Sequence, residues 1–270
     1  MLYPVLHKLL EDQEGERVFT CFTLEHWIYV MFVLAAITTI VLALRHKKQA
    51  VKNRVLTVLT FIPFALYMAD FFLMPLAYGV IDVDKLPFHV CTCMSILCFA
   101  STHAPFLKKL RVHFALLGFI SNLIYVVYPS GVMAYEIAPF SYRVIQTMLF
   151  HSCMIVSCLS VLLFDRHPLQ IKHCYRDLCV LGGMTVWASL GNLFYSGAAD
   201  DYNHNFNWFF VRQDPLNLIP ESIAPYVAPI VNVAVFFAIE IIIYLILRAI
   251  KHQKIEAQQS HQLQGEELSQ

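Results

Sequence analysis

Four polar side chains inside long apolar runs of this sequence come out at similar predicted depths and could do chemistry together. They are Asp70, His89, His151 and Asn192. An ionisable or amide side chain at membrane depth costs free energy on insertion, so each of the four is a candidate functional residue. Counting about 1.5 Å of rise per residue predicts that all four lie at similar heights in the outer half of a bilayer. We therefore expect these side chains to line one cavity.

Two cysteine thiols lie close to this polar layer and could supply a nucleophile. Cys91 and Cys93 follow His89 in the sequence. On a regular helix Cys93 shares a face with His89, whereas Cys91 points roughly 200° away. Because Pro87 lies just before His89, the first helical turn could be irregular and Cys91 could still reach the cavity. Both thiols are therefore candidates.

The polar layer supports three kinds of chemistry. In the first, a cysteine thiolate attacks an acyl ester, a histidine moves the proton, and an amide steadies the oxyanion or the imidazole. In the second, His89, His151 and Asp70 hold a zinc ion that activates water. In the third, two membrane histidines ligate a haem. The sequence has no His-Glu-x-x-His motif, so we predict no metal site.

The residues predicted for acyl chemistry divide into two groups. The catalytic candidates are Cys91, His89 and His151. The orienting or substrate-binding candidates are Asp70, Asn192 and Cys93. An alternative interpretation uses the same layer to hold a solute or a lipid headgroup without any reaction.

The elements that must position these residues are predicted from apolar runs. A bilayer core needs about 20 apolar residues per helix. Seven runs of about that length are bounded by charged or turn residues, approximately Leu24 to Leu44, Val55 to Tyr78, Leu86 to Ala104, Val112 to Tyr128, Val144 to Phe164, Leu178 to Tyr195 and Tyr226 to Leu247. The sequence therefore predicts an all-α polytopic membrane bundle of seven transmembrane helices.

The basic residues are divided unequally between the two sides of this predicted bundle. If the C-terminus is cytoplasmic, the inner segments hold 14 of the 19 Lys and Arg residues. Basic loops resist translocation across the membrane. The sequence therefore predicts an external N-terminus and a cytoplasmic C-terminus.

The composition is also that of a membrane protein. The 270 residues are 58% hydrophobic and only 14% charged, against about 25% charged residues in soluble domains. An ordinary globular core could not bury so many apolar side chains, and lipid would cover the remainder. A formal net charge of zero argues against a nucleic-acid partner.

Three regions are predicted along the chain: an external segment over 1–23, the transmembrane domain over 24–247 and a cytoplasmic tail over 248–270. The longest connection, about 196–225, is external and rich in aromatic residues. We expect it to fold over the mouth of the bundle. The Gln- and Glu-rich tail is predicted to be largely disordered.

Several short motifs match a known family. Leu86-Pro87-Phe88-His89-Val90-Cys91 resembles the Leu-Pro-Leu-His-Leu-Cys signature at the start of the third helix in the bacterial YwaF-type integral membrane family. His151 is similar to that family's membrane histidine, and Asn192 followed by Asn207-Trp208-Phe209-Phe210 and Pro215 resembles its Asn-Tyr-x-Phe-Leu segment. The resemblance covers nearly the whole chain and implies seven helices. It adds Asn207 to the orienting or substrate-binding candidates.

The eukaryotic branch of this family resembles lipid acyltransferases that move polyunsaturated acyl chains onto ether lysophospholipids through a membrane cysteine and a partner histidine. The resemblance matches these histidines to His89 and His151. In that branch the cysteine immediately precedes the first histidine, where this chain has Phe88. The nucleophile would therefore be Cys91 or Cys93.

We therefore predict a multi-pass protein of the bacterial cytoplasmic membrane that acts on lipid acyl groups in an outer-half cavity. Membrane lipid is the expected partner, and no cofactor is predicted. Two alternatives remain open, namely a non-enzymatic transporter or lipid- or solute-binding protein, and a metal-dependent membrane hydrolase.

Overall fold

The computed structural model is all-helical over the residues it describes, which are 17–79, 83–133, 136–195, 207–211, 219–220 and 222–267, together with Val5, Lys8 and Leu10. The elements in chain order are α2 (Leu24–Leu44), α3 (Gln49–Tyr78), η1 (Val83–Lys85), α4 (Val90–His103), α5 (Arg111–Val127), α6 (Ser130–Met133), α7 (Tyr142–Phe164), η2 (Ile171–His173), α8 (Cys174–Phe194), η3 (Trp208–Phe210) and α9 (Ala224–Glu267). Pro215 of the predicted external loop lies outside the described residues.

Six of these helices are long and apolar enough to cross a membrane. Their candidate spans are Leu24–Leu44, Gln49–Leu76, Arg111–Met133, Tyr142–Phe164, Ile171–Phe194 and Ala224–Ile246. The apolar helix α4 has 14 residues, or about 21 Å at 1.5 Å per residue, against about 30 Å for a bilayer core. The prediction of a multi-pass helical bundle is confirmed. A seventh span at α4 and the sidedness of the termini stay predictions.

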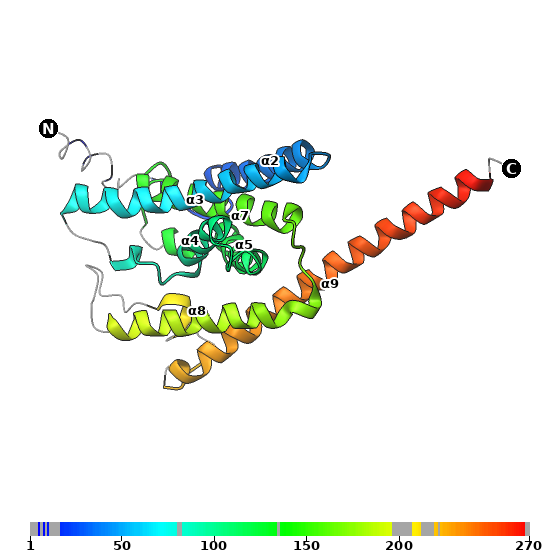
Figure 1. Cartoon of the computed structure of the whole chain (residues 1–270). Helices are drawn as coiled ribbons and strands as arrows, with labels where there is room; N and C mark the ends of the chain where they lie inside the picture. The colour runs from blue at the N-terminus through cyan, green and yellow to red at the C-terminus, as the bar shows by residue number, and fades with distance from the viewer. Residues whose placement is uncertain are drawn as a thin grey trace.

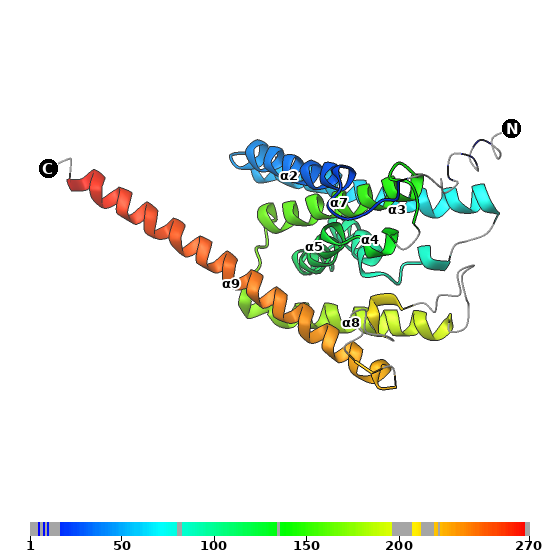
Figure 2. The same ribbon diagram turned by 180° about the vertical axis from the view of Figure 1, so that it is seen from behind.

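The helix directions agree with a bundle whose chain crosses back and forth. Figure 1 shows α3 and α8 running in one direction, with α2 and α9 running in the opposite direction. Helices α8 and α9 lie side by side in both views (Figures 1 and 2), and the second half of α9 extends away from the bundle. The tail, for which the composition predicts disorder, thus continues as helix to Glu267. Its Gln, Glu and Lys residues have good helix propensity, and the preceding span supplies a helix that they can extend.

The segment before α4 is less helical than expected. Helix is predicted from Leu86, but α4 begins at Val90, after His89 with its extended backbone (φ −72°, ψ 143°). Proline disfavours helical conformation in the residue that precedes it, so Pro87 keeps Leu86 out of the helix. The side chain of His89 therefore does not follow the helical register that places Cys93.

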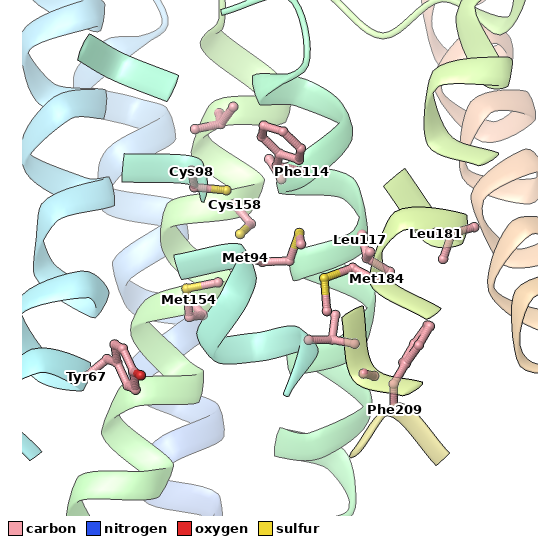
Figure 3. Close-up of a cluster of buried hydrophobic side chains, with 14 of the residues drawn as sticks. Tyr67, Met94, Cys98, Phe114, Leu117, Met154, Cys158, Leu181, Met184 and Phe209 are labelled. Carbon is pink, nitrogen blue, oxygen red and sulfur yellow. The ribbon is translucent and has the colours of Figure 1, made fainter. Parts of the chain in front are cut away.

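The core forms around the two most deeply packed spans. In the spans of α5 and α7, 61% of the residues in the apolar window are buried, against 11% in the spans of α2 and α9. Most side chains of α2 and α9 are therefore left to face lipid. Figure 3 shows the main buried cluster, in which Met94 and Cys98 of α4, Phe114 and Leu117 of α5, and Met154 and Cys158 of α7 meet Leu181 and Met184 of α8. A Cβ atom at Gly118 would lie 2.9 Å from the sulfur of Cys158, so glycine permits the close approach of α5 and α7.

Candidate functional site

A buried ion pair anchors one part of the predicted polar layer. Lys85 Nζ lies 2.8 Å from Asp70 Oδ2, and the hydroxyl of Tyr142 donates to Asp70 Oδ1 at 3.1 Å. The hydroxyl of Tyr67 donates to the backbone oxygen of Lys85 at 3.0 Å. Asp70 is only 2% exposed, and a buried carboxylate is tolerated when it is paired in this way. We call Tyr67, Asp70, Lys85 and Tyr142, with the two histidines described next, the polar cluster.

The hydrogen bonds of His151 fix the tautomer of its neutral imidazole. Its Nδ1 lies 2.6 Å from Asn122 Oδ1, and Asn122 Nδ2 donates to the backbone oxygen of Gly118 at 2.6 Å. Since this second bond assigns the amide nitrogen to Gly118, the amide oxygen faces His151 and accepts from Nδ1. The neutral ring therefore carries its proton on Nδ1 and keeps a lone pair on Nε2, as a general base requires.

The imidazole of His151 is also held by packing and lies near other charged groups. Tyr125 stacks on it with ring centroids 3.8 Å apart and an interplanar angle of 16°. His89 and Lys85 lie within electrostatic range of His151. Asp70, Lys85, His89 and His151 thus belong to one polar cluster.

Both candidate thiols adjoin this polar cluster. Tyr67 lies within electrostatic range of Cys91, Cys93 and Asp70. Cys91 and Cys93 are half-buried, and both pack against the main hydrophobic core. Cys93 also lines a cavity.

An apolar groove of about 340 Å³ lies between α4, α5 and α8. Cys93, Met94 and Leu97 line it from α4, Leu110 and Phe114 from the start of α5, and Cys179, Val180, Gly183, Met184 and Trp187 from α8. Cys179, Gly183 and Trp187 are exposed, so the groove opens on the surface of the bundle. From Cys179 to Trp187 it follows α8 for about 12 Å.

Asn192 orients a loop of the chain. Its Nδ2 donates to the backbone oxygen of Trp208, and its Oδ1 accepts from the backbone nitrogen of Trp208, both at 3.1 Å. Asn207 is the residue before η3, and the ring of Trp208 meets that of His89 edge-on at 6.3 Å. Asn192 thus reaches the polar cluster through Trp208, because its amide is engaged at both ends.

Phe88 points towards α8. Its ring lies 5.0 Å from that of Trp187 and 4.8 Å from that of Trp208. A Cβ atom at Gly191 would lie 2.4 Å from the Phe88 ring, so this glycine makes room for the aromatic side chain. Trp187 Nε1 also donates to the backbone oxygen of Pro87 at 2.7 Å. The segment before α4 is therefore fastened to α8 and η3.

The described residues include no group of three or more His, Cys, Asp or Glu side chains arranged to hold a metal ion. The predicted zinc ligands would have been His89, His151 and Asp70, but in the structure their polar atoms bond to other protein groups. The two oxygens of Asp70 face Lys85 and Tyr142, and Nδ1 of His151 faces Asn122.

The sequence from residue 21 to residue 253 matches the TMEM164 family. The chain belongs to the TMEM164 family. Neither the curated proteins nor the solved structures contain a match to it. Membership in the TMEM164 family and the six apolar helices show a multi-pass membrane protein. The resemblance to the YwaF-type family and a location in the bacterial cytoplasmic membrane stay predictions.

Several residues of the site in this TMEM164-family chain escaped the sequence analysis. Two of them, Lys85 and Tyr142, lie just outside the predicted apolar runs, and Tyr67 resembles an ordinary aromatic core residue. Only the fold brings these side chains to the surroundings of Asp70. Asn122 could have been predicted from the sequence. It is an amide inside an apolar helix, and such a residue usually bonds to a neighbouring helix.

Proposed function

We propose that this TMEM164-family protein transfers acyl chains between membrane lipids, with the thiol of Cys93 as the acyl carrier. One observation carries the proposal: Cys93 lines the apolar groove and also adjoins the polar cluster around Tyr67 and Asp70. A thiol at the junction of an apolar channel and a set of acid/base groups suits a nucleophile that attacks the ester end of a fatty acyl chain.

The groove has the character of an acyl-chain site. Its walls are carbon-rich side chains of three helices, and the groove opens on a surface that lipid would cover. The groove follows α8, as a lipid chain lying along a membrane helix would. Ligand sites of this kind combine an apolar lining with a few polar groups at one end.

The polar cluster would supply the proton transfers. His89 lies one helical turn before Cys93, whose backbone nitrogen donates to the His89 oxygen at 3.0 Å. His151 offers Nε2 as a base, because Asn122 holds its other nitrogen as the donor. Lys85 would stabilise negative charge on the ester oxygen. Asn192 positions Trp208, whose ring meets that of His89.

The reaction would proceed in two balanced steps. The thiol loses its proton to an imidazole and attacks the ester carbonyl, so that a carbon–sulfur bond forms. The carbon–oxygen bond of the donor lipid then breaks, and its oxygen takes the proton from the imidazolium. In the second step the hydroxyl of an acceptor lysolipid attacks the thioester, its proton passes to the imidazole and then to sulfur, and the thiol is restored.

Acyl transfer can be tested with the purified chain in vesicles that contain a phospholipid with a labelled acyl chain and an unlabelled lysophospholipid. We expect labelled product with the wild type and only background with Cys93→Ala. Cys179→Ala is the matched control, because it removes a thiol from the other end of the same groove and should keep activity. Cys91→Ala tests the second thiol and should also keep activity.

Two outcomes would redirect the proposal. Loss of transfer in Cys91→Ala but not in Cys93→Ala would move the nucleophile to the other thiol. Saturable binding of the labelled lipid without any transferred label would contradict acyl transfer and favour a lipid-binding or transport protein.

A further inference from the structure

A second buried polar cluster lies in the opposite half of the bundle. His113 Nδ1 of α5 lies 2.6 Å from Asp177 Oδ1 of α8, and the hydroxyl of Tyr244 of α9 donates to Asp177 Oδ2 at 2.6 Å. Glu240 lies one turn before Tyr244 on α9, within electrostatic range of Asp177. Asp177 and Asn192 are 15 residues apart on α8, so about 22 Å of helix separates Asp177 from the amide that holds Trp208.

Glu240 is the anomalous member of this cluster. Its side chain is fully buried, and neither carboxyl oxygen has a hydrogen-bond partner among the described residues. An ionised carboxylate in such surroundings would be strongly destabilising. Binding a proton would neutralise the carboxylate of Glu240 and remove this cost of burying its charge.

The neighbouring groups cannot balance a second negative charge. Both oxygens of Asp177 are already engaged by His113 and Tyr244, and a single imidazolium balances a single carboxylate. No arrangement of three or more His, Cys, Asp or Glu side chains able to hold a metal is present in the described part of the chain. We therefore infer that the two carboxyl groups, Glu240 and Asp177, and the imidazole of His113 bind a proton.

We propose that Glu240, with Asp177 and His113, forms a proton-binding site that joins α9 to α8 and α5. In this site Glu240 carries the bound proton while α9 is docked. Detaching α9 exposes the carboxyl group to water, where it ionises and releases the proton.

Two titratable groups lie within electrostatic range of Glu240, namely Asp177 of α8 and Tyr244 of α9. His113 of α5 bonds to Asp177, and Cys174 of α8 lies within electrostatic range of Tyr244. The short helix η3, which also contacts α9, consists of Trp208, Phe209 and Phe210 and adds no charge. The protonation of Glu240 is therefore governed by this small set.

The same helix connects the proton site to η3, whose Trp208 ring meets that of His89. Asn232 Nδ2 of α9 donates to the backbone oxygen of Phe209 at 2.8 Å, eight residues or about 12 Å before Glu240. Undocking α9 would release this bond next to Trp208. This regulatory consequence rests on the proposed acyl transfer, whereas the proton site itself does not.

Infrared spectroscopy of the purified chain in lipid nanodiscs tests the bound proton directly, because a protonated carboxyl group has a C=O stretching band that a carboxylate lacks. At neutral pH we expect this band in the wild type and its loss in Glu240→Gln. Glu136→Gln is the control, since Glu136 is exposed and its substitution should leave the band unchanged. Absence at neutral pH of any band that depends on Glu240 would overturn the proposal.

Thermal unfolding against pH gives a second, independent test. A proton held in the folded state and released on unfolding makes the protein less stable as pH rises, and the unfolding equilibrium constant grows by about tenfold per pH unit. Glu240→Gln should lose this part of the slope and Glu136→Gln should keep it. Parallel pH profiles for the wild type and Glu240→Gln would overturn the proposal, and neither test depends on acyl transfer.

Discussion

At the scale of single residues, the pair His151 and Asn122 shows how a membrane amide can prepare an imidazole for proton transfer. The amide can present only its oxygen to the ring, because its nitrogen is bonded to Gly118. The stacked ring of Tyr125 limits rotation of the imidazole. A base whose orientation and tautomer are set before substrate binds needs no rearrangement during the reaction.

The first prediction concerns this pair. Asn122→Ala leaves the Nδ1 proton of His151 without its acceptor, so the turnover number for acyl transfer should fall by about 100-fold, as for loss of a positioned base. The Michaelis constant for lipid should change little, because Asn122 lies away from the groove. Unfolding of the variant should also require about 1–3 kcal/mol less free energy.

Ser121→Ala is the control for this substitution. Ser121 adjoins Asn122, and its hydroxyl donates to the same Gly118 oxygen, so its loss perturbs the helix without touching His151. If Asn122→Ala and Ser121→Ala reduced turnover equally, the proposed role of Asn122 would be wrong.

Residue-level prediction from sequence reached the histidines, the thiols and Asp70, but it missed their partners. An ionisable side chain in an apolar run is visible in any sequence because lipid makes it costly. Lys85 is not visible in this way, since it lies outside the apolar runs in η1 and meets Asp70 only after α3 and the η1 segment fold together. Asn192 was found, but its bonds to Trp208 depend on a loop whose path the sequence does not indicate.

At the scale of elements, a glycine of α8 borders the apolar groove between α4, α5 and α8. A Cβ atom at Gly183 would meet no other atom within 4 Å. Gly183 also lines the groove. A larger side chain at this position would therefore occupy the space proposed for the acyl chain and leave the packing of α8 intact.

Gly183→Leu is therefore expected to abolish acyl transfer in the vesicle assay and to weaken binding of a labelled lipid. Replacing a helical glycine with leucine favours the helix by roughly 0.8 kcal/mol, so a loss of activity should come without a loss of stability. The thermal midpoint and the rate of transfer should be measured together on the same preparation.

Gly182→Leu is the matched control, because a side chain there also meets open space but does not line the groove. It should retain wild-type transfer. Equal loss of transfer in both variants would show that the groove is not the acyl site, and full activity in Gly183→Leu would show the same.

At the scale of the whole molecule, α2 and α9 run opposite to α3 and α8 (Figure 1), as expected of a chain that crosses a membrane repeatedly. The helices were predictable because apolar length and composition are direct physical requirements of a bilayer. The start of α4 was not predictable, because it depends on Pro87 and on the packing of Phe88 against Gly191 of α8. The groove also depends on how three helices pack, which no single helix pattern reveals.

The predicted sidedness can be tested with an epitope tag fused to the C-terminus. Since basic segments remain on the cytoplasmic side, an antibody should reach this tag only after the cells are permeabilised. A tag at the N-terminus should be reached in intact cells. Labelling of the C-terminal tag in intact cells would contradict the predicted orientation.

The most direct test of acyl transfer through Cys93 is mass spectrometry of the peptide that contains Cys91 and Cys93, after incubation with a phospholipid whose acyl chain carries a stable isotope. The account predicts a labelled acyl group on Cys93 that hydroxylamine removes, as expected of a thioester, and no such group in Cys93→Ala. An unmodified Cys93 during continued transfer of the labelled chain would contradict the account.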